Sequence, residues 1–288
     1  MRHEPPYFVA EVSSNHNRNL DRCFQFIDIA ARIGCHAVKF QLFKIDELFS
    51  PEILSQSEKH RQRRAWELPV EFLPDLAKRC RQRQIAFSCT PFYLKAVEEL
   101  APYVDFFKIA SYELLWGDLL RACARSGKPI VLSTGMATID EVEKAVRTLR
   151  EADCCDLTLL HCVSGYPVPP QECNLAAIAT LRNTFGCKVG WSDHSVNPAV
   201  VCRAVHRWDA SMVEFHIDID GHGEEFASGH CWLPEQMEAV IRAAQILPAA
   251  DGDGIKEPTP IEIPDRAWRA DPSDGLRPLR PTREAFHG

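Results

Sequence analysis

Short runs of β-branched and aromatic residues alternate with longer amphipathic stretches along most of the chain. The short runs have the length and composition of buried strands, whereas the longer stretches repeat apolar residues with the period of a helix. Eight strands are predicted, at Tyr7–Glu11, His36–Gln41, Ile85–Cys89, Asp105–Ala110, Pro129–Thr134, Asp156–Cys162, Lys188–Ser192 and Met212–Asp218.

Eight helices are predicted to follow these strands in turn. Local signals mark several of their ends: Gly34 stops the first helix, and Thr138 begins a capping box with Glu141. The predicted helices are Asp21–Ile33, Val70–Arg83, Leu94–Leu100, Leu114–Ser126, Ile139–Glu151, Leu175–Phe185, Pro198–Arg207 and Pro234–Leu247.

This alternation predicts an α/β fold, a (β/α)8 TIM barrel. An open doubly wound sheet is the alternative, but the chain has no glycine-rich phosphate loop to support it. One long excursion, Phe43–Leu68, interrupts the second unit. We expect residues 1–250 to form the barrel and residues 251–288, rich in Pro, Gly, Asp and Arg, to form an extended arm without a second globular domain.

Composition narrows the class of protein. Apolar residues make up 45% and charged residues 25% of the chain, which is typical of a globular enzyme. The formal net charge of −7 disfavours a nucleic-acid partner, and no apolar run is long enough to predict a membrane span. The twelve cysteines lack CxxC spacing, and the N-terminus lacks a signal-peptide pattern. We therefore expect reduced, mostly buried cysteines in a cytoplasmic protein.

Polar and ionisable residues end every predicted strand, where a barrel concentrates its chemistry. Lys39 and Lys108 stand inside otherwise apolar runs, and a buried lysine needs an anionic partner. We expect a locally positive barrel mouth that binds an anionic ligand, although a structural ion pair would also explain each lysine. The strand-end residues are Glu11, Lys39, Gln41, Ser88, Thr90, Lys108, Ser111, Ser133, Thr134, His161, Ser164, Ser192, Asp193, His194, His216 and Asp218.

Two histidines end strands that are neighbours in a closed barrel. His194 and His216 follow the seventh and eighth strands and can therefore share one divalent ion. His222 and His230, in the loop after the eighth strand, could add a third ligand or contact a substrate. Solvated loop side chains are the simpler interpretation of these two histidines.

Six motifs then resemble one family, in register and in the same order. They are AEVSSNHN at 10–17, VKFQ at 38–41, FKIASYE at 107–113, LSTGMAT at 132–138, LHCVSGYP at 160–167 and GWSDHS at 190–195. These motifs are similar to signatures of the N-acetylneuraminate (sialic acid) synthase family, and the resemblance extends over roughly residues 7–247.

The resemblance implies an activity and a set of site residues. The activity is a metal-dependent condensation of phosphoenolpyruvate with an aldehyde sugar, N-acetylmannosamine or a related aldose, which gives a 3-deoxy-2-keto sugar acid and phosphate. Manganese is the implied ion, with Mg²⁺ or Co²⁺ as alternatives, and the implied assembly is a homodimer. By position, Lys39, Thr90, Lys108, Ser111, Ser133, Ser164 and Ser192 match phosphoenolpyruvate contacts, His194 and His216 match metal ligands, and Glu11, Gln41, Glu113 and Tyr166 match residues at the reaction centre and the sugar.

The chain departs from the family in three places. Full-length members carry a C-terminal antifreeze-like domain, and we expect this chain to be a short form without it. Phe215 occupies a position that is usually basic in the family, just before the second histidine. The loop 220–226 lacks the family's proline-containing pattern, so Asp218, Glu224 and Glu225 are only candidates for contacting the sugar.

Two other functions compete with the synthase hypothesis. Lys39 or Lys108 could be the nucleophile of a Schiff-base aldolase. Alternatively, the barrel could bind a metabolite without catalysing its conversion, because a fold does not fix a function. Within the synthase hypothesis, either Glu11 or Glu113 could handle protons, and the sequence does not distinguish them.

Overall fold

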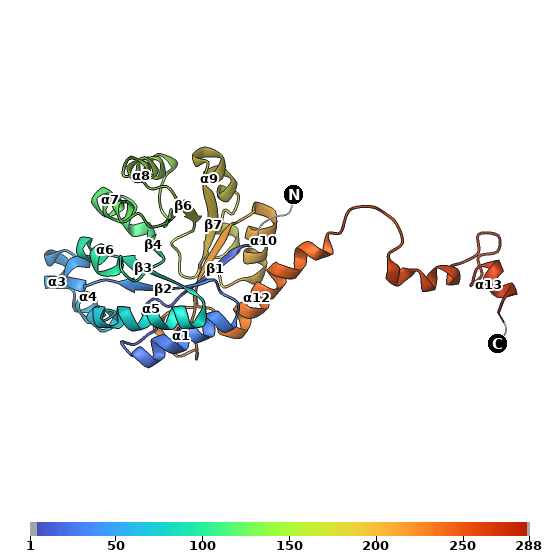
Figure 1. Cartoon of the computed structure of the whole chain (residues 1–288), viewed down its shortest axis with the longest axis horizontal. Helices are drawn as coiled ribbons and strands as arrows, with labels where there is room; N and C mark the ends of the chain where they lie inside the picture. Colours follow the sequence, from blue (N-terminus) through green and yellow to red (C-terminus); the bar gives the residue numbers. More distant parts are fainter. Residues whose placement is uncertain (1–4, 287–288) are drawn as a thin grey trace. The chain divides into compact units, whose positions relative to one another are not determined.

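A closed barrel of eight parallel strands forms the centre of the computed structural model, which describes residues 5–286 (Figure 1). The strands follow one another around the barrel in chain order, and β1 pairs with β8 to close it. The strands are β1 (Tyr7–Glu11), β2 (Ala37–Leu42), β3 (Ala86–Pro91), β4 (Phe106–Ile109), β5 (Ile130–Ser133), β6 (Leu157–His161), β7 (Lys188–Asp193) and β8 (Met212–His216). The predicted TIM barrel is confirmed, with strand ends shifted by at most two residues.

Helices surround this barrel on its outer face, as Figure 1 shows. All eight predicted helical segments contain a helix, at bounds close to those expected. The main helices are α1 (Leu20–Arg32), α5 (Leu73–Arg83), α6 (Leu94–Leu100), α7 (Gly117–Arg125), α8 (Ile139–Glu151), α9 (Ala177–Phe185), α10 (Pro198–Trp208) and α12 (Pro234–Ile246). The predicted capping box of Thr138 and Glu141 begins α8. Helix α7 begins at Gly117, three residues later than expected, and a separate 3₁₀ turn, η3 (Ser111–Glu113), precedes it.

Short helical elements lie in three loops that follow the strands. The excursion after β2 contains α2 (Ile45–Leu48), α3 (Pro51–Gln56), α4 (Glu58–Gln62), η1 (Arg63–Trp66) and η2 (Val70–Phe72). The loop after β6 contains η4 (Pro170–Glu172), and the loop after β8 contains α11 (Glu224–Ala227). These loops place residues from outside the barrel at the carboxyl ends of the strands.

Alternation along each strand separates two cores. Because successive side chains of a strand point to opposite faces, every second residue points into the barrel. An inner cluster contains Val9, Ala37, Phe106, Val131 and Leu160. A much larger cluster, which includes Phe40, Phe107, Trp191 and Phe215, fills the space between the strands and the helices. The inner cluster is small because the remaining inward positions carry polar side chains.

The chain divides into two units, Met1–Leu247 and Pro248–Gly288, which we describe separately. The second unit begins within η5 (Leu247–Ala250) and contains η6 (Pro260–Glu262), η7 (Pro264–Trp268) and α13 (Arg280–Glu284). Asp271 organises it, because this carboxylate accepts hydrogen bonds from the backbone nitrogens of Ser273 at 3.0 Å and Arg280 at 2.8 Å. Arg283 pairs with Asp274 at 2.8 Å.

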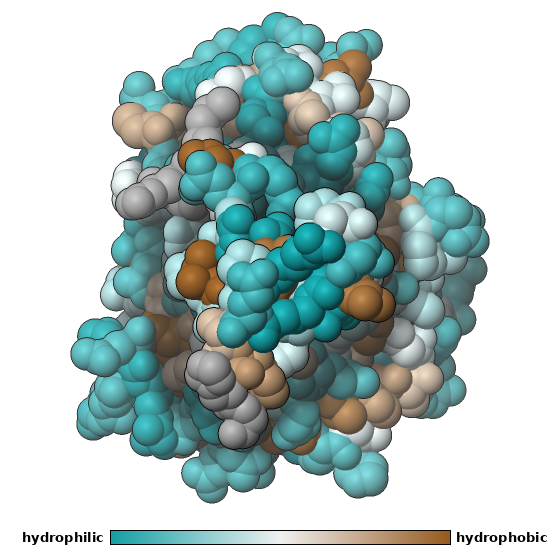
Figure 2. Space-filling model, turned by 90° about the vertical axis from the view of Figure 1, so that its right-hand side faces the viewer, coloured by the Kyte–Doolittle hydropathy of each residue, from teal (hydrophilic) through white to brown (hydrophobic). Residues whose placement is uncertain are grey.

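The polar surface and the free, mostly buried cysteines are those expected from the composition of the chain. The face drawn in Figure 2 is mainly hydrophilic, with hydrophobic side chains in small separate patches. All twelve cysteines are free thiols, and eight of them are buried, whereas Cys155 is exposed. None of the described helices has both the length and the apolar character that a membrane crossing requires.

Gly190 provides a test of the barrel's packing. A Cβ atom at this position would lie 2.3 Å from the backbone oxygen of Met212 and 2.7 Å from Leu160 Cδ2. We expect Gly190→Ala to lower the free energy of unfolding by about 1–3 kcal/mol or more, because backbone atoms cannot move aside cheaply. Gly117→Ala is the matched control, since its Cβ would meet only the flexible end of Arg121 at 3.2 Å. Equal urea midpoints for the two variants would contradict this account.

Candidate active site

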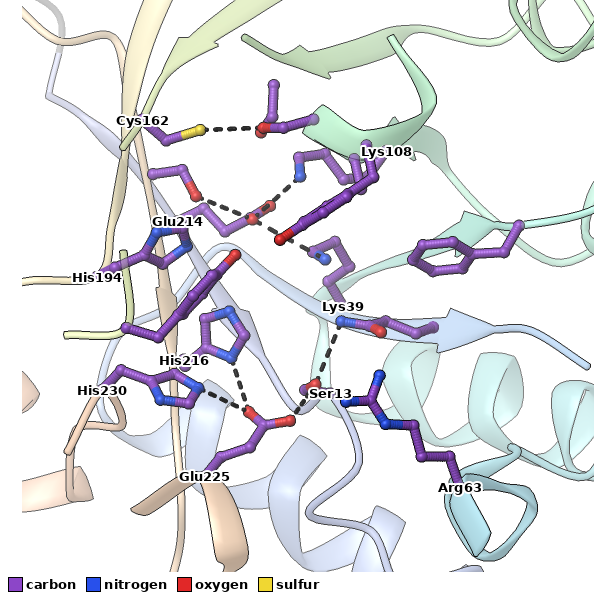
Figure 3. A pocket seen from close by; sticks show the side chains of 18 residues that line it. Ser13, Lys39, Arg63, Lys108, Cys162, His194, Glu214, His216, Glu225 and His230 are labelled. Carbon is purple, nitrogen blue, oxygen red and sulfur yellow. Dashed lines mark hydrogen bonds and ion pairs between the residues drawn. The ribbon is translucent and has the colours of Figure 1, made fainter. Parts of the chain in front are cut away.

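A cavity of about 360 Å³ lies at the carboxyl ends of the strands (Figure 3). The structure brings nine of the predicted site residues to its wall. They are Lys39, Gln41, Lys108, Ser111, Ser133, Tyr166, Ser192, His194 and His216. Most of these are inward-facing strand residues or residues that immediately follow a strand, as expected for a barrel mouth.

Two buried lysines and two buried glutamates form the floor of this cavity. Lys39 Nζ forms an ion pair with Glu11 and lies 3.9 Å from Glu214 Oε1, and Lys108 Nζ lies 3.2 Å from the same Glu214 oxygen. All four side chains are at most 5% exposed. Each lysine therefore has a carboxylate partner, which is the ion pair that the sequence left open beside the expected positive mouth.

These ion pairs determine which of the buried side chains are charged. Burial alone would lower the pKa of Lys39, but the charges of Glu11 and Glu214 outweigh it and raise that pKa. Burial opposes ionisation of Glu214 too, yet Lys108 and Lys39 hold its pKa below the usual value. Lys39 therefore acts as a fixed ammonium group beside the cavity, and Glu214 acts as a fixed carboxylate that also pairs with Lys108.

The sequence analysis missed Glu214 and overvalued Phe215. In β8 the inward positions are Met212, Glu214 and His216, so the alternation that places His216 at the mouth also places Glu214 there. Phe215 points outward and is fully buried in the core between strands and helices. The unusual residue before His216 is therefore not part of the cavity wall, and strand alternation alone could have shown this.

Glu11 and Thr90 support the cavity from beneath. Gln41 donates from Nε2 to Glu11 Oε1 at 2.6 Å, and Lys39 Nζ donates to Thr90 Oγ1 at 3.3 Å. Both acceptors are completely buried. These contacts fix the positions of Lys39 and Gln41 without placing Glu11 or Thr90 on the wall.

Two serines lie against a close turn after β5. Gly135 N donates to Ser111 Oγ at 3.0 Å, and a Cβ at Gly135 would lie 2.5 Å from Ser164 Oγ. Ser164 Oγ is buried and has no hydrogen-bond partner among the described residues. Hydroxyl and backbone N–H groups beside an ammonium group suit an anionic ligand such as phosphate or carboxylate. Glycine at 135 allows the two hydroxyls to approach the turn this closely.

Glu113 has an unusual carboxyl environment. Burial raises its pKa to about 7, although Lys108 pulls it in the opposite direction. Its Oε2 atom is buried without a hydrogen-bond partner in the described part of the chain. A carboxyl group with this pKa can both donate and accept a proton near neutral pH. Glu113 thus differs from Glu11, whose carboxylate pairs with Lys39 and accepts a hydrogen bond from Gln41.

Two histidines from adjacent strands face one another across the cavity. The ring centres of His194 and His216 lie 5.5 Å apart, and the Tyr166 ring lies 4.3 Å from that of His194, tilted by 37°. His194 Nδ1 bonds the backbone oxygen of Val163 at 2.7 Å, which leaves its other nitrogen for a ligand. Burial and His216 lower the pKa of His194 to about 3, so it is a neutral imidazole, the form that binds metals.

The loop after β8 divides into structural and cavity residues. Asp218 pairs with Arg22 at 3.1 Å and accepts from Gly223 N at 2.9 Å, so it anchors the loop. Glu224 and His222 are exposed. Glu225 and His230 instead line the cavity, although the sequence favoured solvation for His230.

Arg63 of η1 reaches the cavity from the excursion after β2 (Figure 3). Its guanidinium carbon lies 5.6 Å from the centre of the Phe49 ring and 5.3 Å from that of Trp66. Its Nε atom is buried without a hydrogen-bond partner among residues 5–286. Sequence reasoning missed Arg63 because nothing in the basic run 59–64 distinguishes one inward arginine from its solvated neighbours.

Comparisons of the sequence and of the structure with known proteins point to the same group of proteins. The sequence model of the NeuB family matches residues 26–256. An uncharacterized protein of Methanocaldococcus jannaschii is 34% identical over 90% of this chain and 76% of its own length. The N,N'-diacetyllegionaminic acid synthase of Campylobacter jejuni is 32% identical over 88% of this chain and 80% of its own. A sialic acid synthetase structure from Leptospira borgpetersenii, solved with citrate, superposes with a TM-score of 0.80 at 29% identity, covering 91% of this chain and 90% of that one.

The pKa of Glu113 predicts a pH-dependent stability. In the folded protein this pKa is raised from 4.5 to about 7, so folding favours the protonated carboxyl. The contribution of Glu113 to the free energy of unfolding is therefore complete below pH 4.5 and is lost as the pH rises to about 7. Glu113→Gln removes this loss because the amide does not ionise. We expect the variant's unfolding free energy to gain up to about 3 kcal/mol over wild type between pH 4.5 and 7.5. Urea titrations across this range measure the gain, and parallel curves would contradict the buried, ionisable carboxyl.

Proposed function

Because the chain belongs to the NeuB family, whose members condense phosphoenolpyruvate with a sugar to form a sugar acid, we propose that it performs this condensation with an aldehyde sugar as acceptor. The product would be a 3-deoxy-2-keto sugar acid of the sialic acid kind, together with phosphate. The observation that carries the proposal is the pair of buried lysines, Lys39 and Lys108, on the wall of a cavity that the hydroxyl-bearing residues Ser111, Ser133 and Ser192 also line.

The charge pattern suits the two anionic ends of phosphoenolpyruvate. Lys39, Lys108 and Ser192 would face its carboxylate and phosphate from the floor, and Ser111, Ser133 and Ser164 would supply hydroxyl groups from the turn side. Glu11 and Thr90 would act indirectly, because they hold Lys39 in place. Glu214 bonds Lys108 at 3.2 Å and Ser192 at 3.2 Å, so it would orient two of these groups together.

A divalent metal ion fits the histidine end of the cavity. The neutral His194 imidazole has one nitrogen fixed by Val163 and one available, and His216 lies beside it. We assign these two residues as ligands, with Mn²⁺ as the preferred ion and Mg²⁺ or Co²⁺ as alternatives. When bound, such an ion supplies Lewis acidity to the aldehyde oxygen of the acceptor.

The reaction then needs the chain to position two substrates and to move protons. The enol carbon of phosphoenolpyruvate attacks the aldehyde carbon, and its C2 gains cationic character. Water adds at C2, and phosphate leaves by cleavage of the C–O bond. Glu113 is our choice for the proton transfers, because its pKa of about 7 suits both directions. The carboxylate of Glu214 would steady the cation at C2.

The acceptor would occupy the outer part of the cavity. Gln41, Tyr166 and Arg63 line this part from three different loops or strands. The unpartnered Nε of Arg63 offers a hydrogen bond to an oxygen-rich substituent of the sugar. We expect the active protein to be a homodimer acting in the cytoplasm.

Phosphate release tests the proposed activity. Full-length protein is incubated with phosphoenolpyruvate, Mn²⁺ and a panel of aldoses that includes N-acetylmannosamine. We expect release with at least one acceptor, loss of release with EDTA, and no borohydride trapping of pyruvate, because Lys39 has a raised pKa and is not a free amine. Trapping that resists EDTA would favour a Schiff-base aldolase. Binding of phosphoenolpyruvate without release from any acceptor would favour a metabolite-binding barrel.

Gly135→Ala tests the placement of phosphoenolpyruvate. The added Cβ would lie 2.5 Å from Ser164 Oγ and 2.9 Å from Ser111 Oγ, so it would displace the two hydroxyls that we assign to binding the anion. We expect KM for phosphoenolpyruvate to rise at least tenfold, with little change in KM for the acceptor. Gly165→Ala is the control, because its Cβ would make only ordinary contacts at 3.7–3.8 Å. An unchanged KM in the first variant would contradict this placement.

A further inference from the structure

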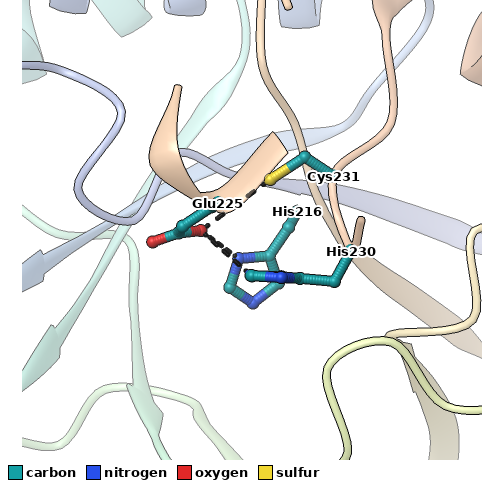
Figure 4. Close-up of side chains that lie close together, drawn as sticks. All are labelled: His216, Glu225, His230 and Cys231. Carbon is teal, nitrogen blue, oxygen red and sulfur yellow. Dashed lines mark hydrogen bonds and ion pairs between the residues drawn. The ribbon is translucent and has the colours of Figure 1, made fainter. Parts of the chain in front are cut away.

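Four potential metal-binding side chains gather beside the cavity, on β8 and the chain that follows it. They are His216 at the end of β8, Glu225 in α11, and the consecutive residues His230 and Cys231 (Figure 4). One ligand atom from each lies within 4.8 Å of the others. Only His216 belongs to the two-histidine pair assigned above, so the other three need a separate explanation.

The distances at the centre of this cluster fit one shared ion. Glu225 Oε2 lies 2.9 Å from His216 Nδ1 and 3.4 Å from His230 Nε2. Ligand atoms bound to one ion at about 2.1 Å are separated by about 3.0 Å in octahedral geometry and about 3.4 Å in tetrahedral geometry. The rings of His216 and His230 are 5.0 Å apart and nearly perpendicular, with an interplanar angle of 73°, so both can approach the same point.

The opposite atoms of Glu225 and His230 are held by other side chains. Glu225 Oε1 accepts hydrogen bonds from the hydroxyls of Ser13 and Ser14, the latter at 3.0 Å. His230 Nδ1 lies 3.3 Å from Ser228 Oγ. This is the arrangement expected around a metal, in which outer partners orient the ligands and leave the inner atoms available.

The loop that carries Glu225 is itself fixed before α11. Asp218 and Asp220 pair with Arg22 at 3.1 and 2.6 Å. Gly223 approaches Asn15 so closely that a Cβ would lie 2.6 Å from Asn15 Oδ1. The polypeptide is therefore held against the chain following β1, and Glu225 is presented to His216 by a preformed loop.

We propose that His216, Glu225 and His230 form a two-histidine, one-carboxylate site for a divalent transition-metal ion. The inference deepens the proposed function and rests on it in taking this ion to be the one that serves the reaction. It extends the ligand set from the pair on β7 and β8 to the loop after β8. Three protein ligands on one side leave positions open toward the cavity, one for His194 and others where a substrate oxygen can bind.

Cys231 borders the site without completing it. Its sulfur lies 3.8 Å from Glu225 Oε2 and 3.6 Å from Asn15 Nδ2. Manganese prefers oxygen and nitrogen ligands to sulfur. We therefore assign Cys231 to the wall of the site, and Cys231→Ser should bind Mn²⁺ within about threefold of wild type.

Binding of Mn²⁺ alone, without substrates, tests the proposal. The signal of free Mn²⁺ in electron paramagnetic resonance gives affinity and stoichiometry for the full-length chain. We expect one ion per chain, and at least tenfold weaker binding for Glu225→Gln and for His230→Ala. Glu224→Gln and His222→Ala are matched controls, since both residues are exposed neighbours in the same loop, and they should bind as wild type does.

The variants separate the possible outcomes. Wild-type affinity in His230→Ala would overturn the proposal even if Glu225→Gln binds weakly, because Glu225 would then only orient His216. Weak binding in His194→Ala, with normal binding in both loop variants, would overturn it while preserving the proposed function. Phosphate release by wild type without any bound ion would refute the metal site and leave the condensation in place. The visible spectrum of Co²⁺-loaded wild type adds a check independent of folding: a sulfur-to-cobalt charge-transfer band would overturn the ligand set.

Discussion

Burial of two ammonium groups inside the barrel is the constraint on which the site depends. A charged lysine is costly to remove from water unless carboxylates compensate it. Lys39 and Lys108 are each about 3% exposed, and Glu11 and Glu214 supply the compensation. This four-residue network fixes the charge at the cavity floor before any substrate arrives. An anionic substrate therefore meets ammonium groups that are already oriented, which is the condition for electrostatic preorganisation.

Alternation of side chains along each strand separates the residues that pack the core from the residues that line the cavity. Inward positions at the amino ends of the strands are apolar, as at Ala37 and Phe106, and those near the carboxyl ends are polar, as at Gln41 and His216. Outward positions build the larger core beneath the helices. Because one strand carries both kinds of residue, packing of the outer face positions the reactive groups on the inner face.

Contacts between distant parts of the chain complete the site. Ser13 follows β1 and Glu225 follows β8, yet the pairing of these two strands makes the side chains hydrogen-bonding partners. The excursion after β2 likewise brings Arg63 to the cavity wall. The inner site thus uses strand residues, whereas its outer part is assembled from loops that differ most readily between related proteins.

The sequence by itself determined the strand–helix order, the family and most of the inner site, because strand alternation and collinear motifs are local properties. It identified Lys39, Lys108, His194 and His216 for this reason. Only the tertiary structure decided which groups compensate the lysines, that Phe215 faces away from the cavity, and that Glu225 and His230 meet His216. Those facts depend on closure of the barrel and on the path of its loops, which no local pattern encodes.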